Sequence, residues 1–145
     1  MTGTGMSDHP AEPFSLRVAE LLDESGQVSG HLWVETDWVQ HSTGHLWWRR
    51  RLAPIPVFQF YESIGDHFTD RWLLQQFEVD AFSELVADLS SGSWRPSYDK
   101  APEDVRYEVR WASADHEQGL ALEIFGMDLR ERRAMRRSRR ARGLL

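Results

Sequence analysis

Histidine side chains are the first residues in this chain whose spacing could support chemistry. His41 and His45 have the HxxxH spacing that places two metal ligands on one face of a helix, and His31 lies upstream. The intervening Ser42-Thr43-Gly44 predicts a turn between strands, and on one extended strand the two imidazoles would lie about 13 Å apart. No carboxylate completes an evident ligand set. We therefore expect exposed loop histidines, with no metal or other cofactor; a metalloenzyme using these three histidines is the alternative.

A second candidate group contains Asp66, His67 and Asp70. General acid–base catalysis needs such groups within hydrogen-bond reach and with shifted pKa values, whereas Asp66 after Gly65 is typical of a turn. The chain contains no GxSxG, GxGxxG or HExxH motif and no glycine-rich phosphate loop. The absence of cysteine excludes thiolate metal sites, cysteine nucleophiles and disulfides. No catalytic residue is identified, and a non-enzymatic protein is favoured over a hydrolase.

Two consecutive segments, 27–39 and 45–52, alternate in polarity and predict the strands of a hairpin. Placing Val39 opposite His45 would bring charged and aromatic side chains together across the strands. The resulting pairs are Glu35 with Arg49, which is ionic, and Trp33 with Arg51, which is a cation–π pair. This chemical matching favours the register.

One face of the predicted hairpin carries the candidate partner-binding residues, which are Trp33, Trp47, Arg49 and Arg51. Tryptophan and arginine dominate the energetics of protein interfaces, and aromatic residues interleaved with arginine can also stack nucleobases. We expect a protein partner or a second copy of the chain to bind this face. The alternative is that the loop at 92–103 covers it.

Arginine residues are concentrated at the C-terminus. Residues 130–145 contain eight arginines and one acid, a formal charge of +7, whereas residues 1–129 contain nine basic and twenty-two acidic residues, a formal charge of −13. A basic arm of this kind is typical of an interaction segment, including nucleic-acid binding. The candidate nucleic-acid contacts are Arg132, Arg133, Arg136, Arg137, Arg139 and Arg140. The alternative is that the arm docks on the acidic body, with an Asp128–Arg132 pair in its first turn and disorder or a frayed helix beyond Arg136.

The remaining pattern supplies the elements that would position these groups. Residues 14–22 and 57–63 have the composition of strands. Asp80 predicts the N-cap of a helix over 80–91, whose apolar residues recur at helical spacing. The segment before it lacks a clean period, so a strand over 71–79 is favoured and a helix over 67–77 is the alternative.

The last elements are predicted to form a closing hairpin. Residues 104–112 alternate strictly in polarity, a turn follows, and Leu120, Leu122 and Ile124 resume the alternation. Pairing Trp111 with Leu122 would match the inward and outward faces of both strands. Strands before and after one amphipathic helix predict an α+β protein: an antiparallel sheet of five to six strands with the helix at about 80–91 packed on one face.

The chain of 145 residues suits one domain, which we place at 13–128 between a disordered lead at 1–12 and the basic arm at 129–145. No apolar run approaches the roughly 20 residues that a membrane span needs, and the N-terminus lacks the pattern of a secretory signal. We therefore predict a cytoplasmic protein without a membrane partner.

The run FEVDAFSELVADL at 77–89, the tryptophan-containing loop after it and the predicted hairpin at 104–125 form a recognisable order. This order resembles small uncharacterised actinobacterial proteins classed as domains of unknown function. The resemblance implies no activity, cofactor or site residue, and it does not include the arm. The leading hypothesis is a non-enzymatic, protein-binding or self-associating accessory or regulatory module, comparable to immunity proteins. Nucleic-acid binding through the arm is the alternative.

Overall fold

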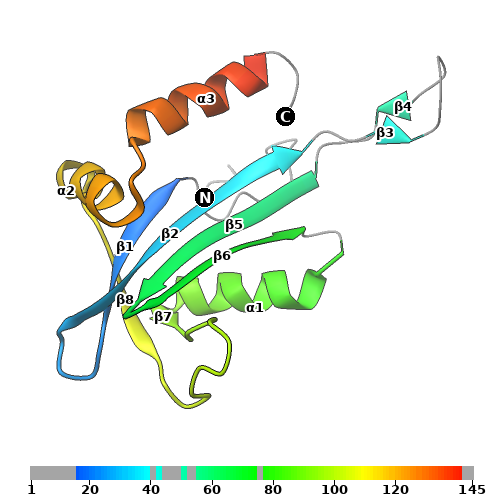
Figure 1. Cartoon of the computed structure of the whole chain (residues 1–145). Helices are drawn as coiled ribbons and strands as arrows, with labels where there is room; N and C mark the ends of the chain where they lie inside the picture. The colour runs from blue at the N-terminus through cyan, green and yellow to red at the C-terminus, as the bar shows by residue number, and fades with distance from the viewer. Residues whose placement is uncertain (1–15, 40–41, 44–49, 52–54, 75–76, 142–145) are drawn as a thin grey trace, which may run out of the picture.

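The computed structural model describes residues 16–39, 42–43, 50–51, 55–74 and 77–141. Its centre is a curled antiparallel sheet, with one helix packed on one face and the C-terminal helices on the other (Figure 1). The architecture is α+β, and the sheet has six strands, so the predicted fold class is confirmed.

The six strands lie in the spatial order β6-β5-β2-β1-β8-β7. Their bounds are Arg17–Leu22 for β1, Val28–Val39 for β2, Ile55–Ile64 for β5, His67–Leu74 for β6, Ser93–Trp94 for β7 and Tyr107–Trp111 for β8. A separate ribbon pairs β3, Ser42–Thr43, with β4, Arg50–Arg51. The two edges of the main sheet therefore differ: β6 has eight residues and β7 has two.

Helix α1 spans Val79–Ser90, between β6 and β7. After β8 the chain forms α2 at Ala114–Leu120, which continues into a π-helical turn, η3, at Ala121–Phe125. Gly126 then adopts φ +64°, a left-handed conformation that costs glycine little, and this ends η3. The last helix, α3, spans Leu129–Ala141.

The α1 core lies between the sheet and α1. Side chains alternate along a strand, so Leu32 and Val34 of β2 share this face with Phe58 and Phe60 of β5. From α1, Phe82 and Leu89 lie seven positions apart on one stripe and fill the opposite side. Phe82 meets Phe58 edge to face, with the ring centroids 5.9 Å apart. The predicted helix, packed on one face of the sheet, is thus confirmed, and the face that it covers is apolar and buried.

The C-terminal core lies on the other face of the same sheet. Trp33 of β2 and Tyr61 of β5 point to this side, where the α2–η3–α3 segment contributes Leu120, Ala121 and Leu129. The sheet is therefore buried on both faces along its central strands. This second layer was not the favoured prediction. We assigned Leu120 to Ile124 to a strand, and docking of the arm at 129–145 on the body was only the alternative.

The segment before α1 contains a strand, but this strand lies earlier than the predicted 71–79. β6 occupies His67–Leu74, and α1 already begins at Val79, with Glu78 at the N-cap position. The alternative of a helix over 67–77 is wrong. Asp80 lies in the first turn of α1 rather than at the N-cap. In the first turn its negative charge is stabilised by the positive end of the helix dipole.

The predicted hairpin of 27–39 with 45–52 is wrong. β2 pairs with β5 along ten residues, so Glu35 lies opposite Gln59 and Trp33 lies opposite Tyr61. The physical reason is burial: pairing with β5 places Val34 beside Phe60 on one face and Trp33 beside Tyr61 on the other, and all four are buried. Burial of such side chains contributes more than one ionic and one cation–π pair worth about 0.2–1 kcal/mol each.

The second predicted hairpin is also wrong in its last strand. Tyr107–Trp111 is a strand, but it pairs with β1, with Trp111 opposite Ala19, and the residues of the expected partner strand are helical. A short apolar run such as Leu120 to Ile124 fits both a strand and a helix face, because its ends are four residues apart. β1, the first strand of the domain, therefore occupies the position beside β8 that we predicted for a strand at 120–124.

Replacing Phe58 by alanine tests the α1 core. Phe58 is fully buried, so removing its ring is expected to lower the free energy of unfolding by about 3–5 kcal/mol. Urea unfolding followed by tryptophan fluorescence measures the change. Phe77→Ala is the matched control, because Phe77 is 69% exposed and its loss should change stability by no more than about 0.5 kcal/mol. Equal effects of the two variants would contradict the burial described here.

Candidate protein-binding surface

Trp33, the first predicted partner-binding residue, is not on the surface. Its side chain is fully buried, and its ring meets Tyr61 and Phe125 edge to face at centroid distances of 6.1 and 6.0 Å. The prediction that it contacts a partner is therefore corrected: the chain's own η3 covers it. The loop at 92–103, expected as the cover, lies on the opposite face, where Trp94 joins the α1 core.

The other predicted residues of that face add nothing to a site here. Trp47 and Arg49 lie outside the described residues. Arg51 belongs to β4, where only the backbone course is described. Of the four residues, only Trp33 has a described side chain, and its burial beneath η3 removes it from an exposed face.

The first turn of the basic arm is docked on the sheet. Asp128 caps α3, since its Oδ1 accepts hydrogen bonds from the amides of Arg130 and Glu131 at 2.9 and 3.4 Å. The amide of Leu129 donates to Gln118 Oε1 at 3.0 Å, and its side chain enters the C-terminal core. The predicted ion pair of Asp128 with Arg132 is wrong, because the Arg132 side chain turns towards the sheet.

Arg132 forms an ion pair with Glu35 of β2, through two guanidinium nitrogens. Glu35 is completely buried, and the Arg132 side chain is 22% exposed. Burial alone would lower the pKa of Arg132, but the hydrogen bond and the charge of Glu35 outweigh it and raise that pKa above its ordinary value. The guanidinium also donates to Gln59 Oε1 at 3.5 Å, and Gln59 Nε2 donates to the Tyr61 hydroxyl at 2.7 Å.

Arg133 is engaged in the same way, since it donates to Glu117 Oε1 at 2.8 Å and to the backbone carbonyl of Leu16 at 3.4 Å. Two of the predicted nucleic-acid contacts are therefore occupied by the protein itself. The remaining four belong to α3, whose backbone is helical through Ala141; they are Arg136, Arg137, Arg139 and Arg140, whose side chains lie outside the described residues. The arm is a helix rather than a disordered segment over these positions.

Replacing Arg132 by methionine tests the buried ion pair. The variant removes the Arg132 guanidinium from the buried Glu35 carboxylate, which is expected to cost about 3–5 kcal/mol of stability, whereas the double replacement Glu35→Met/Arg132→Met should recover most of it. Urea unfolding of the single and double variants measures both effects. Arg130→Met, an exposed arginine two positions earlier, serves as the control. A loss as large for Arg130→Met, or no recovery in the double variant, would contradict the pairing.

His31 and His67, the two described histidines among the candidates, lie on opposite faces of the sheet. His31 is half-buried on β2 with Glu20 opposite it on β1, and His67 stacks on Tyr98 at 3.9 Å on the other side of the sheet. His41 and His45 lie outside the described residues. Asp70 is three positions from His67 on β6 and so points to the opposite face. Within the described ranges no group of three or more potential ligands could hold a metal ion.

Burial lowers the pKa of His31 below its ordinary value of 6.5, although Glu20 and Glu123 act in the opposite direction and His116 adds to the lowering. The folded protein therefore binds this proton more weakly than the unfolded chain does. Stability contributed by neutral His31 is complete above pH 6.5 and decreases as the pH falls towards the folded pKa.

His31→Gln should therefore lose less stability than the wild type on acidification from about pH 7.5 to about pH 5.5. Urea unfolding at both pH values provides the comparison. The exposed His67→Gln variant is the control and should keep the wild-type slope. An unchanged slope in His31→Gln would show that its burial does not govern the acid response.

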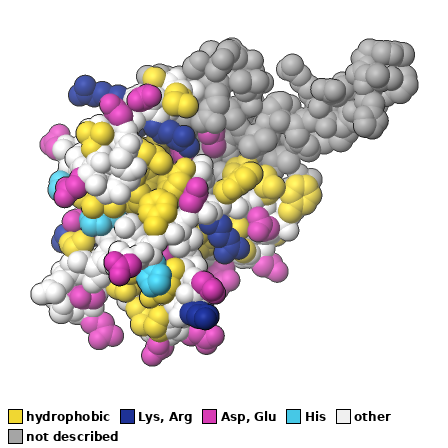
Figure 2. Space-filling view, in the orientation of Figure 1, with side chains coloured by type: hydrophobic (Ala, Val, Ile, Leu, Met, Phe, Trp, Pro, Cys, Tyr) yellow, Lys and Arg dark blue, Asp and Glu magenta, His cyan; other side chains and the backbone are white. Residues whose placement is uncertain are grey.

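An exposed aromatic surface lies on β6 instead. Phe68 and Trp72 are 58% and 61% exposed, four positions apart on a strand, and therefore on the same face. Figure 2 shows hydrophobic side chains extending across this side of the molecule, from the C-terminal helices towards the far end of β6, with acidic side chains around them. Exposed large aromatics in such a group mark interaction sites.

Phe68 is supported from beneath by the C-terminal core. Its ring lies 6.2 Å from Tyr61 and 6.3 Å from Phe125, and these rings in turn contact Trp33. The exposed ring is thus the outer member of a rigid aromatic cluster. Rigid aromatic anchors lose little conformational entropy on binding.

Asp70 lies between the two aromatics on the same face. It pairs in register with Tyr61, whose pKa is raised first by burial and then by the Asp70 charge. No described basic side chain forms an ion pair with Asp70. The surface thus offers an uncompensated negative charge between two apolar anchors.

The backbone of β6 adds a second binding element. β6 pairs with β5 from His67 to Leu74, and no described strand pairs with its outer edge. Such an edge presents a row of amide and carbonyl groups to another extended chain. We define the β6 surface as this edge together with Phe68, Asp70 and Trp72. The sequence pattern of this surface is an alternation of aromatic, acidic and aromatic residues at 68, 70 and 72. We did not recognise it, because the surrounding segment shows no regular polarity pattern.

Comparisons with protein-family models, curated proteins and solved structures find no match for this chain. Among the described residues, no helix combines the length and the apolar composition required to cross a membrane. The function of the protein is therefore inferred from the geometry of the β6 surface.

Proposed function

We propose that this protein is a binding module that takes up an extended, basic segment of another protein as an additional strand along β6. The observation that carries the proposal is the coincidence of the outer edge of β6, with which no described strand pairs, with two exposed aromatic side chains on the same strand. Backbone pairing at an exposed edge supplies affinity in this mode, and alternate side chains supply specificity. The proposal keeps an accessory, non-enzymatic role and moves the binding residues from the expected hairpin to β6.

Charge indicates the chemistry of the bound segment. Asp70 is flanked on the same face by Phe68 and Trp72, so a strand placed opposite would satisfy it with a lysine or arginine between two apolar residues. The acidic body, with a formal charge of −13 over residues 1–129, would also attract a basic segment from a distance.

Self-pairing of β6 is less favourable. An antiparallel dimer that matches the faces of both strands and overlaps nearly all of β6 must be centred on Asp70 or on Arg71. Either register places a residue opposite its own copy, and like charges opposite one another are destabilising. A different partner strand avoids this repulsion, so we assign the surface to a second protein rather than to a second copy.

Selection from a random library of short displayed peptides tests this proposal. Enriched peptides should carry lysine or arginine with apolar or aromatic residues two positions before and after it. Fluorescence polarisation with an enriched peptide should give binding that weakens by about tenfold or more in Phe68→Ala and in Trp72→Ala, the size of effect expected for interface anchors.

A charge exchange provides the sharper control. Asp70→Arg should lose the basic peptide and bind its counterpart in which glutamate replaces the central base. Phe77→Ala, an exposed aromatic outside the β6 surface, should bind like the wild type. Enriched peptides without the basic centre, or binding that is indifferent to all three β6 substitutions, would overturn the proposal, as would a concentration-dependent dimer in light scattering that Trp72→Ala abolishes.

A further inference from the structure

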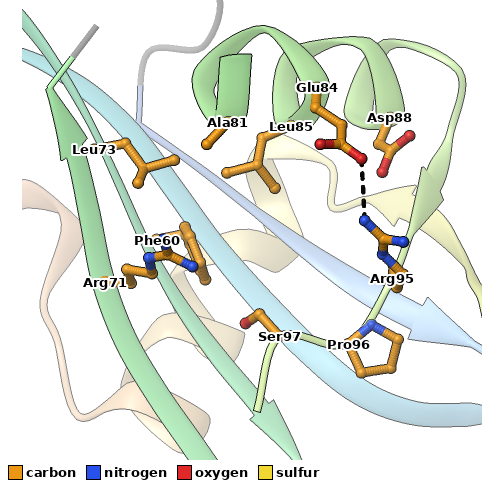
Figure 3. Close-up of a pocket in the computed structure, with 10 residues that line it drawn as sticks. All are labelled: Phe60, Arg71, Leu73, Ala81, Glu84, Leu85, Asp88, Arg95, Pro96 and Ser97. Carbon is orange, nitrogen blue, oxygen red and sulfur yellow. Dashed lines mark hydrogen bonds and ion pairs between the residues drawn. The ribbon is translucent and has the colours of Figure 1, made fainter. Parts of the chain in front are cut away.

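A cavity of about 240 Å³ lies between α1 and the sheet, on the side opposite the aromatic anchors (Figure 3). Its apolar lining comes from Phe60 of β5, Leu73 of β6 and Ala81 and Leu85 of α1. The polar side chains that line it are Arg71, Glu84, Asp88, Arg95 and Ser97. The cavity thus combines an apolar part with an equally large polar part, and a small-molecule site needs both kinds of lining.

The outer side of the cavity is closed by the segment after β7. Glu62, buried on the α1 face of β5, accepts hydrogen bonds from the Trp94 indole at 2.5 Å and from the Ser97 amide and hydroxyl at 3.0 and 3.2 Å. These three bonds hold residues 94–97 against the sheet. The wall that carries Arg95 and Ser97 is therefore fixed in place before any ligand binds.

The charged side chains around the cavity differ in their partners. Arg95 pairs with Glu84 at 3.0 Å, and Asp88 pairs with Arg106 outside the cavity at 3.5 Å. Arg71 is exposed and has no carboxylate partner among the described residues. Figure 3 shows its side chain extending from β6 towards the middle of the cavity, beside Phe60. The Arg71 guanidinium is thus available for a ligand beside the apolar part of the lining.

We propose that this cavity binds a small monocarboxylate with a short apolar body. The carboxylate would accept charge-assisted hydrogen bonds from the Arg71 guanidinium, for which a planar two-oxygen anion is the matching shape. The apolar body would lie against Phe60, Leu73 and Leu85. A volume of 240 Å³ is below the roughly 300–1,000 Å³ of pockets for drug-sized molecules, so the ligand is small.

Titration of the full-length protein with hexanoate, followed by amide chemical shifts in NMR, tests the proposal. Saturable shifts are expected at residues around the cavity, and hexan-1-ol, which has the same chain without the charge, should bind about tenfold more weakly or worse. Butyrate should also bind more weakly than hexanoate, because it buries less apolar surface.

Two variants distinguish the contribution of the Arg71 charge from that of the apolar part of the cavity. Arg71→Gln should weaken hexanoate binding by about tenfold or more while leaving hexan-1-ol unaffected, and Ala81→Leu, which fills the apolar part, should weaken both. Arg130→Gln, an arginine on α3, is the matched control. The amide spectrum of each variant reports whether the fold is retained. Shifts that do not saturate, shifts centred away from the cavity, or equal binding in Arg71→Gln and Arg130→Gln would overturn the proposal.

Discussion

The ion pair between Glu35 and Arg132 determines how the two halves of this structure meet. Glu35 lies at the middle of the longest strand and is completely buried, so its charge requires a partner that remains charged. Arg132 supplies that charge from the first turns of α3, and through Gln59 it connects to the Tyr61 hydroxyl. One interaction thereby orients the arm on the sheet and supports the base of the exposed aromatic surface.

Burial of the central strands on both faces leaves exposed aromatic side chains at the β6 edge. The helices cover the central strands, and the chain has no further described element to place over the outer part of β6. In the middle of the sheet Phe68 and Trp72 would be ordinary core residues. At the edge the same residue types stay exposed, and this exposure is why we propose them as binding groups.

Local sequence patterns predicted the parts of the fold that depend on local interactions. The helix, predicted at 80–91 from helical spacing, is found at 79–90. The turn predicted from Gly65 followed by Asp66 is also found, and Gly65 adopts φ +56° there. Strand pairing was not predictable, because the choice between residues 45–52 and β5 depends on which segment buries more surface. The location of the candidate site depended on this pairing. Because Trp33 lies opposite Tyr61 and is buried, the predicted site at Trp33 was replaced by the candidate surface on β6. The alternative in which the arm docks on the acidic body was the correct one for Arg132 and Arg133.

The position of β1 has a consequence for how the chain acquires its structure during synthesis. β1 lies between β2 and β8, and its pairing with Trp111 joins residues ninety-two positions apart. A nascent chain can form the first four strands of the sheet in sequence, but one side of β1 stays open until β8 has left the ribosome. During that interval the growing polypeptide exposes the six-residue β1 as an edge strand, where the finished sheet ends in the two-residue β7. A long edge strand can pair with another chain, so premature association is the hazard of this stage.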